Sequence, residues 1–168
     1  MTRVLVPGSF DPITHGHMDI ITRCSALFDE VVVGVGDNLA KRYLFSRHKR
    51  VELARQSVAQ LDNVMVQPID GLLATWCQEH HIDVIAKGLR SAMDASFELP
   101  QATVNRNLAD IETILLATHP SLAHVSSTIV KEVAANGGDV SAMVDTHVSD
   151  ALMSTILASS GGDGAHDE

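Results

Sequence analysis

Short apolar runs rich in β-branched residues alternate with helical patterns along most of this chain. The runs predict strands at Val4–Val6, Val31–Val35, Val64–Pro68, Val84–Ala86 and Ile114–Ala117. The helical patterns cover Ile20–Phe28, Val51–Leu61, Leu72–His80, Phe97–Leu108, a stretch that begins at Ser126, and Asp145–Leu157. Such continuous apolar runs are typical of strands that are buried on both faces. We therefore predict an α/β domain whose five parallel strands carry helices on both faces.

Length and charge limit the remaining possibilities. The 168 residues suit one domain, which we expect to span residues 1–158 and to end in a disordered acidic tail, residues 159–168. A formal net charge of −9 argues against non-specific binding to nucleic acid. No apolar run approaches the ~18 residues of a membrane span, and no secretory signal is visible. We expect a cytoplasmic protein in which Cys24 and Cys77 are buried free thiols.

The first predicted strand leads into a motif with phosphate-binding chemistry. Residues 7–12 read PGSFDP, and residues 14–17, THGH, open the first helix. A helix start attracts phosphate because its N–H groups are unpaired. Thr14 and His17 lie one helical turn apart, and Gly16 allows a close approach, an arrangement that suits a nucleoside triphosphate attacked at its α-phosphate. A capping or surface histidine is the alternative, and the motif alone leaves it open.

Two further motifs follow predicted strands, at the edge where parallel sheets bind ligands. Lys87-Gly88-Leu89-Arg90 comes after the fourth strand, and its two cations suit phosphate contact. Ser126-Ser127-Thr128 follows the fifth strand and opens a helix, with Lys131 one turn further on. Its hydroxyls can cap the helix, cradle a phosphate, or do both.

The basic residues are unevenly spread. Five of the twelve lysines and arginines lie within ten positions: Lys41, Arg42, Arg47, Lys49 and Arg50. Lys41 comes soon after a strand and suits an anionic substrate, whereas the last three fit a solvated helix start equally well. Glu98 is either an exposed helix residue or a ligand for a ribose or cation. The histidines lack zinc-ligand spacing, so we predict no structural metal site.

Taken together, PGSFDPITHGH at 7–17, KGLR at 87–90 and SST at 126–128 closely resemble bacterial phosphopantetheine adenylyltransferases. The resemblance covers about residues 4–157. It implies a Rossmann-like fold assembled as a homohexamer. The implied reaction joins ATP and 4′-phosphopantetheine into dephospho-coenzyme A and pyrophosphate, with Mg²⁺, in coenzyme A biosynthesis. It also implies feedback inhibition by coenzyme A.

The resemblance assigns residues by position. The catalytic candidates are His17, Lys41 and Arg90. The implied ATP contacts are Ser9, Phe10, His17, Gly88, Leu89, Arg90, Glu98, Leu122, Ala123, His124, Val125, Ser126, Ser127 and Thr128. The implied acceptor contacts are Ser9, Lys41, Leu73 and Lys87. The chain departs from the family by having Ser9 for threonine, Lys87 for arginine and Thr128 for serine. Pro100 is expected to kink the helix that carries Glu98.

Two alternatives remain open on the sequence. The chain could transfer an adenylyl or cytidylyl group to another phosphate. It could also be a nucleotide-sensing module whose THGH motif only cradles a phosphate. The agreement of three motifs favours phosphopantetheine as the acceptor.

Overall fold

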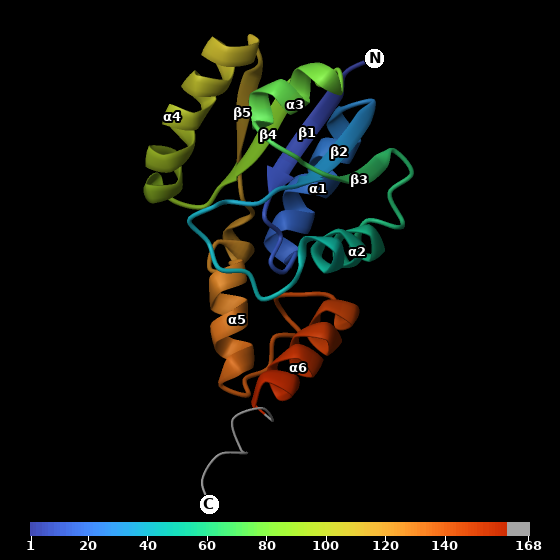
Figure 1. The fold of residues 1–168 in the computed structure, drawn as a ribbon, viewed down its shortest axis with the longest axis vertical. Coiled ribbons are helices and arrows are strands. Elements are labelled where there is room, and N and C mark those ends of the chain that lie inside the picture. The colour runs from blue at the N-terminus through green and yellow to red at the C-terminus, as the bar shows by residue number, and fades with distance from the viewer. Residues whose placement is uncertain (161–168) are drawn as a thin grey trace, which may run out of the picture.

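One sheet of five parallel strands forms the centre of the computed structural model, which describes residues 1–160 (Figure 1). The strands are β1 (Arg3–Gly8), β2 (Glu30–Val35), β3 (Val64–Pro68), β4 (Val84–Leu89) and β5 (Glu112–Ala117). Their order is β3-β2-β1-β4-β5, so the chain reverses direction across the sheet between β1 and β4. The predicted parallel sheet is confirmed.

Side chains along each central strand alternate between two separate cores. Val4 and Val6 of β1 belong to a core cluster with residues of α1 (His15–Leu27) and α2 (Arg47–Ser57). Leu5 belongs to a second cluster that includes Trp76 and Cys77 of α3 (Leu73–Glu79). Because successive residues of a strand face opposite ways, the two clusters lie on opposite faces of the sheet. The prediction of helices on both faces is confirmed.

Helix starts differ most from the sequence prediction. Helix α2 begins at Arg47 and α4 (Ala92–Ala109) begins at Ala92, four and five residues before the predicted starts. The side chains of Ser46 and Ser91 cap these helices by accepting N–H bonds from Lys49 and Asp94. The apolar periodicity begins only after these polar first turns, which explains the late predictions. Helix α4 continues through Pro100 without ending there.

The structure corrects the interpretation of Arg50 as part of a solvated helix start. A solvated helix start was one reading for Arg47, Lys49 and Arg50, yet the side chain of Arg50 is only 1% exposed. Arg47 and Lys49 remain partly exposed and are paired with acidic residues. The sequence gives no sign of this difference, because the partners of Arg50 lie at irregular separations of 5 to 41 residues along the chain.

The last two helices lie together beyond the carboxyl ends of the strands (Figure 1). They are α5 (Ser127–Ala135), preceded by a short 3-10 turn at Pro120–Leu122, and α6 (Thr146–Ser160). Gly137 follows α5 with a φ of +75°, the left-handed conformation that glycine commonly adopts just past a helix end. Helix α6 runs two residues past the expected domain end at 158, and residues 161–168 of the expected tail lie outside the described residues.

Both cysteines are buried and unpaired, as predicted. Within residues 1–160, none of the helices has the length and apolar character needed to cross a membrane.

Candidate active site

A cavity of about 290 Å³ opens at the carboxyl ends of β1 and β4, where the strand order reverses. This is the edge at which open α/β sheets bind ligands. The cavity brings together most of the residues that the sequence selected: Ser9, Phe10, His17, Lys41, Lys87, Gly88, Arg90, Glu98, Val125, Ser126, Ser127 and Thr128. They come from five separate stretches of the chain.

Five selected residues do not line this cavity: Leu73, Leu89, Leu122, Ala123 and His124. Leu73 packs against the second core cluster, and Leu122 packs against the first. The 122–125 turn nevertheless borders the start of α1. A Cβ atom on Gly16 would lie 3.5 Å from the carbonyl oxygen of Val125 and 4.0 Å from that of Leu122.

Two helix starts face the cavity. Thr14 caps α1, and Ser126 caps α5 by accepting the N–H of Ile129. Ser127 donates its hydroxyl to the carbonyl of Pro12 at 2.8 Å, which joins the start of α5 to the loop before α1. Ser126 thus has the predicted capping role. The unpaired N–H groups and partial positive charges of both helix starts favour a polyanion between them.

His17 is held by a reciprocal cap. The hydroxyl of Thr14 accepts the N–H of His17, and the N–H of Thr14 donates to Nδ1 of His17 at 3.0 Å. A backbone N–H can only donate, so Nδ1 must be the unprotonated nitrogen of a neutral ring. The proton therefore lies on Nε2. The ring also packs edge-on against Phe10, which is 2% exposed and has a left-handed φ of +49°.

Burial, and to a smaller extent the positive charges of Arg90, Lys41 and Lys87, together lower the pKa of His17 to about 4. The imidazole is therefore neutral at physiological pH and carries one donor, Nε2–H. Because the ring stays neutral well below pH 7, its Nε2–H can donate a hydrogen bond to a phosphate oxygen over a wide pH range.

Histidine-selective NMR should show this state directly. We expect the His17 ring to be in the Nε2–H form at pH 7 and to titrate near pH 4. Lys41→Ala should move the midpoint upward, because a repelling charge is removed. A wild-type midpoint near 6.5 would contradict the assigned burial and charge effects.

Arg90 is oriented by a carboxylate that the sequence reasoning missed. Asp94 accepts Nε and Nη2 of Arg90, each at 3.1 Å, and Val125 accepts Nη1 at 3.3 Å. Partial burial alone would raise the pKa of Asp94, but the hydrogen bonds and charge of Arg90 outweigh this and hold the pKa below its ordinary value. The i, i+4 spacing of Arg90 and Asp94 was the feature of the sequence that could have predicted this ion pair.

The remaining cations differ in their surroundings. Lys87 forms an ion pair with Glu98, 3.1 Å from Nζ to Oε2, and both side chains are at most one-fifth exposed. Lys41 is exposed, and within the described residues its ammonium has no hydrogen-bond or ion-pair partner. Lys41 is thus free to meet an anion, while Lys87 already shares its charge with Glu98.

Asp11 is a second acidic residue that sequence reasoning left without a role. Its side chain is buried and accepts the N–H groups of Leu44 and Phe45 and the ammonium of Lys131. Lys131 does not line the cavity, and its ammonium is paired with Asp11 instead. Among residues 1–160, no three His, Cys, Asp or Glu side chains are grouped as a metal site.

Comparison with known proteins agrees with this geometry. The sequence profile of the cytidylyltransferase-like family matches residues 5–133. A phosphopantetheine adenylyltransferase from Pseudarthrobacter chlorophenolicus is 47% identical over 149 residues, 88% of this chain and 90% of the relative. Those from a Nocardioides species and from Streptomyces coelicolor are each 46% identical. The alignments cover 94% and 90% of this chain, and 99% and 96% of the respective relatives.

A solved structure from Vibrio parahaemolyticus, provisionally assigned as a nicotinate-nucleotide adenylyltransferase, has a similar fold. It superposes with a TM-score of 0.65 over 96% of this chain and 94% of that chain, at 19% identity. At that identity the likeness shows the fold only.

Proposed function

This chain belongs to the cytidylyltransferase-like family and, within it, to the phosphopantetheine adenylyltransferases, and from that membership we propose that it adenylylates 4′-phosphopantetheine. The products are dephospho-coenzyme A and pyrophosphate. One structural observation carries the proposal. Two helix starts, the neutral His17 and three cations converge on a single cavity at the sheet's reversal point.

The reaction joins two phosphates. An oxygen of the acceptor phosphate forms a bond to the α-phosphorus of ATP, and the bond from that phosphorus to the β-bridging oxygen breaks. Pyrophosphate leaves with the electron pair. The acceptor phosphate is already anionic near neutral pH, so the step needs no strong general base. Catalysis then consists of positioning the two phosphates and stabilising charge on the α-phosphate.

The residues divide between the two substrates. Nε2–H of His17 donates to a non-bridging oxygen of the α-phosphate, where negative charge develops. Arg90, held by Asp94, and the start of α5 stabilise the triphosphate. Lys41, Lys87 and the hydroxyl of Ser9, which line the same cavity, bind the acceptor phosphate. The assignment of Lys41 to the acceptor phosphate agrees with its ammonium having no ion-pair partner within the described residues.

Mg²⁺ fits this site as an ion that arrives with ATP. The cavity carboxylates are engaged, because Asp94 pairs with Arg90 and Glu98 with Lys87. Mg²⁺ is commonly held by substrate phosphates with at most one or two carboxylates, and Glu98 and Asp94 are carboxylates that line the cavity. A bound Mg²⁺ would supply positive charge that offsets the negative charge of the pyrophosphate.

The assembly, regulation and location belong to the same proposal. Helix α4 exposes the side chains of Met93, Phe97, Val104 and Leu108, which recur at helical spacing and supply an apolar face for a homohexamer. Coenzyme A resembles the product and would compete for the same cavity, which supports feedback inhibition. Two free buried thiols agree with a reducing cytoplasm.

The test is pyrophosphate release from ATP, Mg²⁺ and 4′-phosphopantetheine, with CTP and other phosphorylated acceptors run in parallel. We expect release with ATP and 4′-phosphopantetheine above every other pair. Release with CTP or with another acceptor instead would favour a different nucleotidyltransferase. ATP binding without release for any acceptor would favour a sensing module.

A further inference from the structure

The segment that carries Lys41 is attached to the rest of the fold by side-chain hydrogen bonds from Arg50 and Tyr43. This Lys41 segment, residues 37–46, leaves the end of β2 and reaches the start of α2 without a helix or strand of its own. Lys41 lines the cavity from the middle of it. Because a loop has few internal bonds, the place of Lys41 depends on what holds the segment from outside.

The buried guanidinium of Arg50 contacts both ends of the Lys41 segment. Nε donates to the carbonyl of Phe45 at 3.2 Å, and Nη2 contacts the carboxylate of Asp37. Nη1 donates to the carbonyls of Ser9 at 2.7 Å and Gly36 at 3.0 Å. One side chain thus binds both ends of the Lys41 segment and the backbone of Ser9, the hydroxyl residue across the acceptor site.

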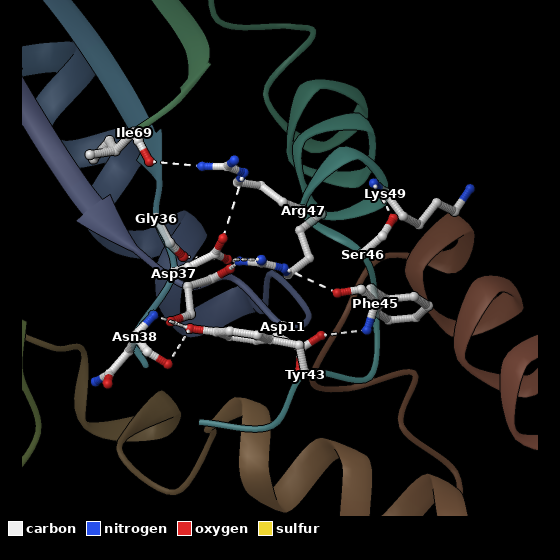
Figure 2. Close-up of polar contacts among 12 residues, drawn as sticks. Asp11, Gly36, Asp37, Asn38, Tyr43, Phe45, Ser46, Arg47, Lys49 and Ile69 are labelled. Carbon is white, nitrogen blue, oxygen red and sulfur yellow. Dashed lines mark hydrogen bonds and ion pairs between the residues drawn. The ribbon is translucent and has the colours of Figure 1, made fainter. Parts of the chain in front are cut away.

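Tyr43 extends this connection to the hydroxyl of Ser9. The guanidinium carbon of Arg50 lies 4.1 Å from the centre of the Tyr43 ring. The hydroxyl of Tyr43 lies 3.2 Å from Oγ of Ser9 and accepts the N–H of Asn38. Figure 2 shows Tyr43 beside Asn38, and Asp11 meeting the N–H of Phe45 further along the segment.

We propose that Arg50, with Tyr43 stacked on it, is a positioning residue that holds Lys41 and Ser9 at the distance an acceptor phosphate requires. Neither residue needs to touch the substrate. The inference rests on the proposed function, because it gives Lys41 and Ser9 the acceptor phosphate. A buried arginine that only stabilised α2 would not need to bind the backbone of Ser9 and of the Lys41 segment together.

The first variant is Arg50→Lys, with Arg55→Lys as its matched control. Lysine keeps the charge but cannot bind four partners in the plane of a guanidinium. Arg55 lies on the same helix, and among residues 1–160 the polar contact of its guanidinium is with the carbonyl of Val66, at 3.4 Å. We expect Arg50→Lys to raise the acceptor KM by about tenfold or more while the ATP KM stays nearly constant. The control should match the wild type in both constants.

Tyr43→Phe tests the inference without disturbing the buried charge. It keeps the ring on Arg50 and removes one hydroxyl, so it should fold even where Arg50→Lys does not. We expect a rise of about three- to tenfold in the acceptor KM, the value of one neutral hydrogen bond. An unchanged acceptor KM in Tyr43→Phe and in folded Arg50→Lys, or an equal rise for ATP, would overturn the inference.

Amide hydrogen exchange on the free enzyme separates this inference from the proposed function. Arg50→Lys should speed exchange across residues 37–46 and leave α3 and β5 unchanged, whereas Arg55→Lys should not affect the segment. Wild-type exchange in a folded Arg50→Lys protein would overturn the anchoring whatever the activity. Absence of turnover by the wild-type enzyme would instead defeat the proposed function, and the exchange result would still decide whether Arg50 holds the segment.

Discussion

His17→Ala is expected to lower kcat by about 10²–10³, which corresponds to roughly 3–4 kcal/mol for one lost donor to a developing charge. The KM values for both substrates should stay nearly constant, because Nε2–H acts on charge that develops during the reaction. Steady-state kinetics with each substrate varied in turn measures both constants.

His15→Ala is the matched control for this variant. The ring of His15 lies two residues away but contacts the carbonyl of Ala142 at 3.1 Å and Asp145 at 3.2 Å, outside the cavity. We expect its kcat to equal that of the wild type. A His17→Ala enzyme with unchanged turnover would remove His17 from the mechanism.

Lys41→Ala is expected to raise the KM for 4′-phosphopantetheine by about 10- to 100-fold, since it removes a charge-assisted bond to the acceptor phosphate. The KM for ATP should change far less. Arg42→Ala removes the neighbouring exposed charge, which does not line the cavity, and should have little effect on either constant. Equal losses for ATP and acceptor in Lys41→Ala would contradict the division of the site between the two substrates.

The sheet could be predicted because its signal is local. Each strand is a short apolar run, and the alternation of Val4, Leu5 and Val6 between two cores follows from strand geometry alone. The cavity could be located for the same reason, since parallel strands place the ends of β1 and β4 at one edge. Helix starts were less predictable, because Ser46 and Ser91 begin their helices before any apolar periodicity appears.

The contacts that orient the site residues depend on folding. Arg50 reads as one more cation in a basic cluster, yet its partners are carbonyls of residues 9, 36 and 45. Asp11 likewise meets Lys131 across 120 positions of the chain. A sequence lists donors and acceptors but does not pair distant ones. Lys87 illustrates the consequence, because its ion pair with Glu98 could not be foreseen from either residue alone.

The most direct test of the central claim follows the oxygens of the acceptor phosphate. The enzyme is incubated with ATP and with 4′-phosphopantetheine labelled with ¹⁸O at its non-bridging phosphate oxygens, and the masses of both products are measured by mass spectrometry. Attack on the α-phosphate predicts dephospho-coenzyme A that retains every labelled oxygen, together with unlabelled pyrophosphate. Label in the pyrophosphate, or a labelled product with no adenylyl group, would contradict the account.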